Sequence, residues 1–240
     1  MLLCFSSCTV IQTAQVPSVH ELEGRWISQT YLTTLRATKS PIHALDHITV
    51  PLFDIGTKDH DSYWSILYNF HDGATLPIKN IQATSKRDTF FVDVIPAYSS
   101  DKSKNYLVYS YSDKDRLTWI LDDGVSSTVE QYVRKDSTFS FEDLVLNGTY
   151  TDSLNRLYEF NNHTAKWPKK VFNYDLGLDH VEIRCDYLEV LNDTTHNGSP
   201  LRYGFKITNG DLSLYNLHRD QEGIELLYDS LPFLMLKTRK

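Results

Sequence analysis

Two short stretches with the same spacing decide how this chain folds. Leu22–Trp26 reads Leu-Glu-Gly-Arg-Trp, and Leu146–Tyr150, 124 positions later, reads Leu-Asn-Gly-Thr-Tyr. In both, every second position carries leucine, glycine or an aromatic residue. This period of two is typical of a β-strand with one buried face. The repetition predicts that the chain contains two similar modules, each opening on such a strand.

The later strands of the two modules also match. Tyr109–Tyr111 and Leu117–Leu121 flank a polar Asp-Lys-Asp turn, and Tyr203–Ile207 and Leu212–Asn216 flank Thr-Asn-Gly-Asp. Asn-Gly between two alternating apolar runs is a strong signal for a β-hairpin. We therefore expect tandem modules over residues 19–135 and 143–240, joined through residues 136–140.

Further alternating runs follow one another at roughly the 8–12-residue spacing that favours sandwiches or closed barrels over βαβ units. They are Tyr63–Phe70, Phe90–Ile95, Tyr106–Tyr111, Val129–Val133, Arg156–Phe160, Lys170–Tyr174, Val181–Val190, Ile224–Tyr228 and Phe233–Leu236. One helix is expected over residues 30–38, because Tyr31, Leu32 and Leu35 share a helical face and Pro41 follows; Ile42–Leu45 forms at most a short turn. The predicted fold is all-β, with two tandem antiparallel β-barrels and one short helix in the first.

Composition agrees with a folded, sheet-rich protein. Of 240 residues, 41% are hydrophobic, and Tyr 15, Phe 11 and Trp 4 far outnumber Met 2. Aromatic residues suit the pleated surface of a sheet, and this much apolar surface excludes a disordered chain. The formal net charge of −7, with no basic patch, argues against nucleic acid as a partner.

The first residues resemble the tail of a bacterial lipoprotein signal. A short apolar stretch leads through two serines to Cys8, whose thiol we expect to carry the lipid. Residues 1–18 would then be a signal remnant and tether, and the protein would lie in the bacterial cell envelope, held to the membrane by this anchor only. The positively charged start of such signals is absent, so a cytoplasmic protein is the alternative.

The Leu-x-Gly-x-aromatic starts and the strand rhythm resemble the lipocalin-like (calycin) barrels, some of which are bacterial lipoproteins. The resemblance implies that Gly24 lets the first strand bend, that Trp26 plugs the closed end of the barrel, and that the helix after this strand acts as a lid. It also implies a small apolar ligand inside a barrel. No ligand residue is carried over from the family.

The candidate ligand residues come from the aromatic strand faces. Trp64, Tyr68 and Phe70 share one predicted face, Trp119 lies on another, and Trp26 stands at the closed end. These rings either fill the barrel completely or line a cavity. A cavity of at least roughly 300 Å³ would favour ligand binding.

Candidate metal sites are weak. His43 and His47 have the i, i+4 spacing of zinc ligands on a helix, but no third ligand is identifiable. The acidic runs at residues 58–61 and at Asp122–Asp123 lack the alternating spacing of calcium loops, so solvated turns are favoured. No metal and no cofactor is assigned.

Candidate catalytic groups are weak too. His71 beside Asp72 resembles an oriented base, but Asp-Gly after a strand is ordinary turn chemistry. Cys185, on a face with Val181 and Ile183, is expected to be a buried, inert thiol. No catalytic residue is assigned.

Three functions remain open at this point. The first is a non-catalytic, lipid-anchored envelope protein that binds a small apolar ligand in a barrel. The second is an interaction or structural lipoprotein with filled cores. The third, least favoured, is a hydrolase or isomerase on the same scaffold. The ligand, partner, membrane leaflet and oligomeric state do not follow from the sequence.

Overall fold

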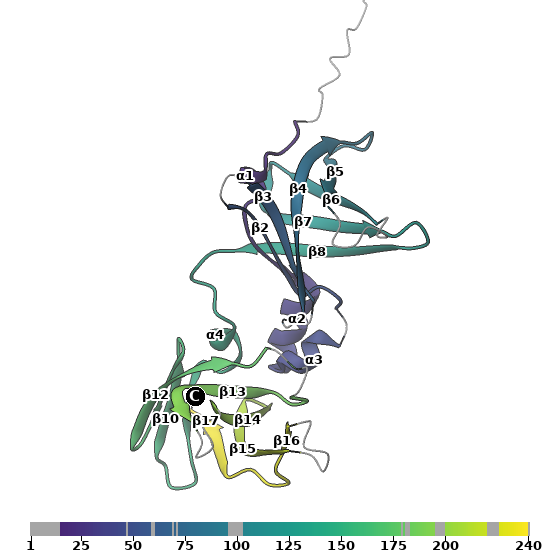
Figure 1. Cartoon of the computed structure of the whole chain (residues 1–240). Helices are drawn as coiled ribbons and strands as arrows, with labels where there is room; N and C mark the ends of the chain where they lie inside the picture. Colours follow the sequence, from purple (N-terminus) through teal and green to yellow (C-terminus); the bar gives the residue numbers. More distant parts are fainter. Residues whose placement is uncertain are drawn as a thin grey trace, which may run out of the picture.

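The computed structural model describes residues 15–46, 48–58, 61–68, 70, 72–95, 103–178, 180, 183–194, 200–219 and 226–239. Within them the strands form two antiparallel barrels (Figure 1). In the first, β1 to β8 pair in chain order and β8 closes on β1. In the second, β9 to β15 and β17 form the ring, β14 and β15 pair, and β16 joins the side of β15. The predicted all-β fold with two tandem barrels is confirmed.

The elements of the first half are α1 (Val19–Leu22), β1 (Gly24–Ser28), α2 (Gln29–Thr38), α3 (Pro41–Leu45), β2 (Leu52–Lys58), β3 (Asp61–Leu67), β4 (Gly73–Ala83), β5 (Thr89–Val94), β6 (Lys104–Ser110), β7 (Asp113–Asp122) and β8 (Ser127–Lys135). Those of the second half are α4 (Phe141–Val145), β9 (Gly148–Thr151), β10 (Leu157–Asn161), β11 (Thr164–Trp167), β12 (Lys170–Leu176), β13 (Tyr187–Thr194), β14 (Pro200–Thr208), β15 (Asp211–Arg219), β16 (Leu226–Tyr228) and β17 (Leu234–Thr238).

The predicted helix is present as α2, and local chemistry sets its ends. The Ser28 side chain caps its first turn by accepting a hydrogen bond from the Tyr31 N–H. At the other end Lys39 adopts a left-handed conformation, and its N–H bonds to the Leu35 carbonyl. Ser40 and Pro41 then start α3, with proline at the position where its missing N–H costs nothing.

More short elements exist than the sequence suggested. The described residues contain four short helices instead of one, because α1 and α4 are single capped turns too short for a periodic pattern. Strands β2, β4 and β11 were not predicted; the outer, polar face of β4 and the four-residue length of β11 hide their alternation. The strand predicted over Val181–Val190 is wrong at residues 184–186, because β13 begins at Tyr187; residues 181 and 182 lie outside the described part of the chain.

The helices α2 and α3 lie between the two barrels (Figure 1). Tyr31, Leu32 and Leu35 of α2 pack into the same hydrophobic cluster as the interior of the second barrel. The first barrel has a separate cluster, built around Trp26 and Trp64. The helices of the first half, together with Ile27 of β1 and Leu52 of β2, therefore share the core of the second barrel, whereas the interior of the first barrel forms its own cluster.

Polar contacts also join the helices α2 and α3 to the second half of the chain. The Lys39 Nζ donates to the Leu144 carbonyl oxygen at 2.6 Å, and the Ile42 N–H donates to the Asp186 carboxylate at 3.0 Å. Burial raises the pKa of Asp186 to about 6, although hydrogen bonds from Ser40 and Ile42 act against this. The carboxyl group from the second barrel thus holds the start of α3.

Candidate functional site

The closed end of the first barrel is built around Trp26. Its indole N–H donates to the Leu22 carbonyl oxygen at 2.8 Å, so the first and last residues of the repeated pattern bond to each other. Gly24 between them has φ +135°, which a residue with a side chain rarely adopts. The Arg134 guanidinium lies over the Trp26 ring, 4.6 Å from its centroid, and donates to the Glu21 carbonyl. Trp26 is fully buried and belongs to this plug.

Aromatic rings fill the barrel from this plug toward the other end. Trp26 contacts Phe53, and Phe53 contacts Trp64 with 5.3 Å between ring centroids. Trp64 in turn lies 5.0 Å from Trp119. Trp64 is fully buried, so it is a core residue and leaves no space beside it for a ligand.

One cavity of about 150 Å³ remains at the mouth of the first barrel. Its described lining residues are Ile48, Thr49, Val50, Tyr68, Trp119, Leu121, Thr128, Glu130 and Tyr132. Two of the five predicted ligand residues, Tyr68 and Trp119, therefore line one space. The volume is about half of the roughly 300 Å³ at which drug-sized ligand sites begin.

Phe70 is not part of this cavity. Strand β3 ends at Leu67, and Phe70 follows with φ +60°, which turns it away from the barrel. Its ring packs 5.4 Å from Tyr31 and 5.8 Å from Phe141, between the barrels. The prediction that Phe70 shares the inward face of Trp64 is wrong, because the strand does not continue that far.

Glu130 is the charged residue of the mouth. It lies directly opposite Trp119 in the pairing of β7 with β8, so both side chains point into the barrel. Its Oε1 accepts hydrogen bonds from the Ser28 hydroxyl at 2.8 Å and the Thr30 N–H at 3.4 Å. Beside it, the Tyr132 hydroxyl donates to the Val50 carbonyl, and burial raises the pKa of this phenol.

Besides a hollow of about 230 Å³ lined by residues that include Val108, Arg116 and Gln131, two still larger hollows lie on the barrels. One, of about 400 Å³, is lined by residues on the outer wall of the first barrel, including Tyr106 and Ile120, whose strand neighbours point inward. The other, of about 420 Å³, lies where β9 and β17 meet in the second barrel and includes Asp152 and Lys237. Both are surface grooves, and neither contains a predicted ligand residue.

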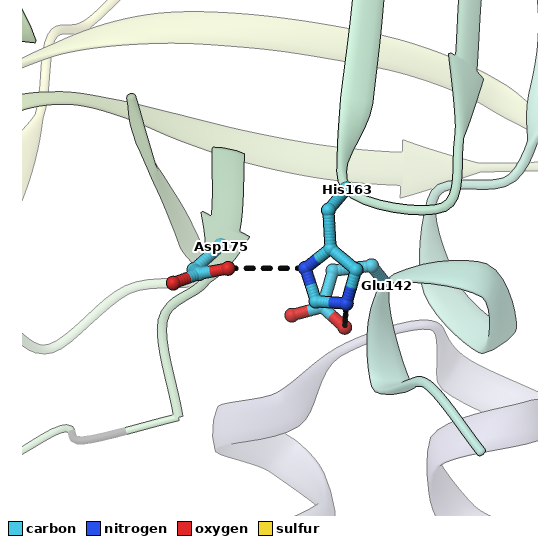
Figure 2. A group of neighbouring side chains, drawn as sticks. All are labelled: Glu142, His163 and Asp175. Atoms are coloured by element: carbon cyan, nitrogen blue, oxygen red, sulfur yellow. Dashed lines mark hydrogen bonds and ion pairs between the residues drawn. The ribbon is translucent and has the colours of Figure 1, made fainter. Parts of the chain in front are cut away.

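A second cluster of titratable groups lies at the second barrel (Figure 2). His163 sits in the turn between β10 and β11, with its Nδ1 3.0 Å from the Asp175 carboxylate on β12. Its Nε2 lies 3.6 Å from the carboxylate of Glu142 on α4. The candidate ligand atoms of the three residues lie within 4.8 Å of one another. The ring stands between the two carboxylates, which is the arrangement of an ion-paired imidazolium.

The electrostatics agree with this ion pair. Partial burial lowers the pKa of His163, but the Glu142 charge and the hydrogen bond to Asp175 outweigh it and raise the pKa above its usual value. Both Glu142 oxygens are also occupied, by the Leu176 N–H and by the Ser140 hydroxyl. The cluster therefore fastens α4 to β12, and a metal would first have to displace the imidazole from between the carboxylates.

The other sequence candidates can be placed in part. His43 pairs with Asp46 at 3.1 Å, whereas His47 lies outside the described residues. Asp123 accepts hydrogen bonds from the N–H groups of Val125 and Ser126, which confirms a turn there. The Asp72 side chain is exposed to solvent. Within the acidic run 58–61, residues 59 and 60 are not described, and neither are His71 and Cys8.

Cys185 is buried, as expected. It packs with Ile183 and Tyr187 in a small cluster. Burial raises the pKa of its thiol to about 12, so the thiol stays protonated and unreactive at neutral pH.

Glu130 and Tyr132 were not predicted from the sequence as residues of the cavity. Val129–Val133 was predicted as a strand with no buried face assigned, and in the structure Val129 is 59% exposed whereas Tyr132 is buried. The turn at residues 123–126 held the missing signal, because it pairs Asp122 with Ser127 and so fixes which residues oppose Trp119. The three members of the His163 cluster come from separate elements, so no local pattern reveals them.

Comparisons with known proteins add no family. Neither a scan against protein-family models nor searches of the curated proteins and of the solved structures found a match. Among the described residues, no helix is both long and apolar enough to span a membrane. Any functional proposal for this chain has to start from its own side chains.

Proposed function

We propose that this protein is a non-catalytic binding protein that holds a small ligand, or one end of a larger one, at the mouth of its first barrel. The observation that carries the proposal is the cavity of about 150 Å³ where Tyr68, Trp119 and Tyr132 meet inside the barrel wall. A cavity of roughly this size in another protein holds one benzene-sized molecule. A long apolar ligand does not fit, since Trp64 occupies the space below.

The surroundings of the cavity support a preformed site. Ser28 and Thr30 hold the Glu130 carboxylate from the start of α2, and the Tyr132 hydroxyl bonds to Val50. The helix layer behind them is fixed by the core of the second barrel. In this proposal the second barrel supports the mouth of the first, which reduces the ordering cost of binding.

A blocking variant tests the proposal. Thr128 lines the cavity and is exposed, so Thr128→Phe should fill the mouth without disturbing the core. Gln131→Phe, on the outer face of the same strand, is the matched control. Ligand-observed NMR with a library of single-ring and small amphiphilic compounds should give hits that Thr128→Phe abolishes and Gln131→Phe keeps. Hits that survive Thr128→Phe, or none at all, contradict the proposal.

The second candidate function is an interaction or structural protein with filled cores. The continuous contacts from Trp26 through Phe53 and Trp64 to Trp119 favour it, because they leave little interior space. An NMR screen without a single hit at the mouth would support this alternative.

We also propose that the body is a lipid-anchored, lipocalin-like (calycin) protein of the bacterial envelope. The lipid anchor rests on the sequence before Cys8. The calycin relationship is supported by the barrel starts, where Trp26 bonds back to Leu22 and Tyr150 to Leu146. Labelling of cells with an alkyne fatty acid should mark the wild type and not Cys8→Ala; an unlabelled wild type would overturn the anchor.

A further inference from the structure

The charge of the mouth cavity selects one class of ligand. Among the described residues that line it, Glu130 alone is charged; the others are aliphatic, aromatic or threonine. No lysine or arginine is among those lining residues, so nothing there compensates an anion. A negative group in a mostly apolar cavity favours a cation and disfavours an anion.

Glu130 keeps part of its hydrogen-bonding capacity. Its Oε1 accepts from Ser28 and Thr30, whereas Oε2 has no hydrogen bond or ion pair within the described part of the chain. A carboxylate can accept about four hydrogen bonds, so capacity remains for a ligand. Because Glu130 faces inward opposite Trp119, this capacity lies inside the barrel wall.

Aromatic side chains close the floor of the cavity and one stands at its rim. The Trp119 indole N–H donates to the Asn105 side chain at 3.0 Å, and the Tyr132 hydroxyl donates to the Val50 carbonyl at 2.9 Å, so neither side chain has a donor left for a ligand. Trp119 is 5% exposed and Tyr132 is 1% exposed, so they form the buried floor. The ring that a ligand can reach most fully is Tyr68, at the rim, with 38% of its surface exposed.

We propose that this cavity binds a small organic cation with an alkylated ammonium group, held by the ring of Tyr68 and the exposed part of Trp119 and neutralised by Glu130. Aromatic rings attract cations through their π-faces, and quaternary ammonium groups are recognised in this way by cages of aromatic side chains. A trimethylammonium group has a bulk similar to the benzene that fills a cavity of roughly 150 Å³. The inference rests on the proposed function, since it names the ligand class of the same site.

The test compares two probes of the same shape. Choline carries a trimethylammonium group, and 3,3-dimethylbutan-1-ol replaces it with a neutral tert-butyl group. Isothermal titration of the full chain should show choline binding at least about tenfold more tightly, as expected for a desolvated cation–π site. Glu130→Gln, which keeps an oxygen acceptor for Ser28, should weaken choline by about tenfold and leave the neutral probe unchanged.

Further variants separate the site from general effects. Tyr68→Ala, at the rim, should weaken choline by about three- to tenfold. Glu159→Gln, which removes an exposed carboxylate paired with Lys166 on the second barrel, should change nothing. Should Glu130→Gln fail to fold, intermolecular NOEs on the wild type replace it: the N-methyl protons of choline should contact the ring protons of Tyr68 and Trp119.

The outcomes distinguish the two levels of the proposal. Equal binding of both probes, or neutral-probe binding alone, overturns the cation inference and leaves the proposed binding function standing. Binding of neither probe, together with an NMR screen without hits, overturns both. Choline NOEs to rings other than those of the mouth also overturn the inference.

Discussion

The first and second barrels start on the same pattern and close in different ways. Trp26 lies opposite Arg134 across the β1–β8 seam, and the guanidinium covers the indole ring. Tyr150 occupies the same place in the second barrel, but the residue opposite is Thr238, which bonds to Gly210 instead. In both barrels the aromatic side chain donates to the leucine four residues before it.

The difference shows which part of the repeat is constrained. The bond from the aromatic residue back to the leucine carbonyl depends on spacing alone, and both halves keep it. The residue opposite the aromatic side chain comes from the last strand of each barrel, and it is Arg134 in the first barrel and Thr238 in the second. The helix insertion after β1 adds a second asymmetry, because α2 and α3 pack in one cluster with the interior of the second barrel and with Ile27 and Leu52 of the first.

The largest expected effect comes from the plug itself. Trp26→Ala should lower the free energy of unfolding by about 4 kcal/mol, because it empties a fully buried site and leaves Arg134 without its ring. Tyr150→Ala should cost less, since none of the described charged side chains lies over that ring. Urea unfolding followed by circular dichroism measures both. Equal losses would show that Arg134 adds nothing to the first closure.

The helix layer gives the next effect. Leu35→Ala should cost about 3 kcal/mol, because Leu35 is fully buried. Although Leu35 belongs to the first half of the sequence, hydrogen exchange should show the loss in β10 and β12 of the second barrel. Leu107→Ala, in the core of the first barrel, is the control with the opposite pattern. Loss of protection in β6 and β7 with Leu35→Ala would contradict the shared core.

The junction adds a pH dependence. Burial raises the pKa of Asp186 from 3.8 to about 6, so the folded state favours the protonated carboxyl. The stability from this proton is complete below about pH 3.8 and is lost as the pH rises through 6, with a slope of at most about 1.4 kcal/mol per pH unit. Asp186→Asn should remove this fall between pH 4 and 6 in urea unfolding. An unchanged profile would show that Asp186 does not titrate there.

The next effect comes from Arg134 and Thr238, the residues opposite Trp26 and Tyr150. Arg134→Met should cost about 2 kcal/mol, through loss of the cation–π contact and of a charged hydrogen bond to Glu21. Thr238→Val, at the matching position, should cost about 1 kcal/mol or less, because its hydroxyl makes one neutral hydrogen bond. Thermal unfolding of the two variants compares the closures directly. A larger loss for Thr238→Val would reverse the comparison.

The smallest effect concerns His163. Its pKa is raised, so its contribution to stability is complete below its unfolded pKa and is lost as the pH rises through the folded value. The ring is 44% exposed and Asp175 is 55% exposed, so screening should keep the effect to at most about 1 kcal/mol. His163→Gln should flatten the stability profile near neutral pH, as urea unfolding at several pH values would show. A profile of His163→Gln identical to that of the wild type would show that the ion pairs of His163 with Glu142 and Asp175 do not stabilise the fold.

The strand alternation, the hairpin turns and the helix after β1 were all predictable, because each depends on residues close in the chain. The Leu-x-Gly-x-aromatic repeat predicted two barrels, and Tyr31, Leu32 and Leu35 predicted α2. Phe70 was misplaced because the predicted strand was extended almost to the Asp72-Gly73 turn signal, whereas β3 ends at Leu67 and the Tyr68 N–H already bonds to the Asp72 carbonyl. Glu130 was not predicted because Val129 and Val133 of β8 are more apolar than the inward-facing residues of the same strand, Thr128, Glu130 and Tyr132.

By itself the sequence determined the class of fold, the number of barrels and the aromatic strand faces, since these follow from periodicity along the chain. The tertiary structure decided that Tyr68 and Trp119 share a cavity with Glu130, and that His163 lies between Glu142 and Asp175. It also decided that α2 belongs to the second core. These pairings join residues dozens of positions apart or on separate elements, and only barrel closure and register bring them within contact distance.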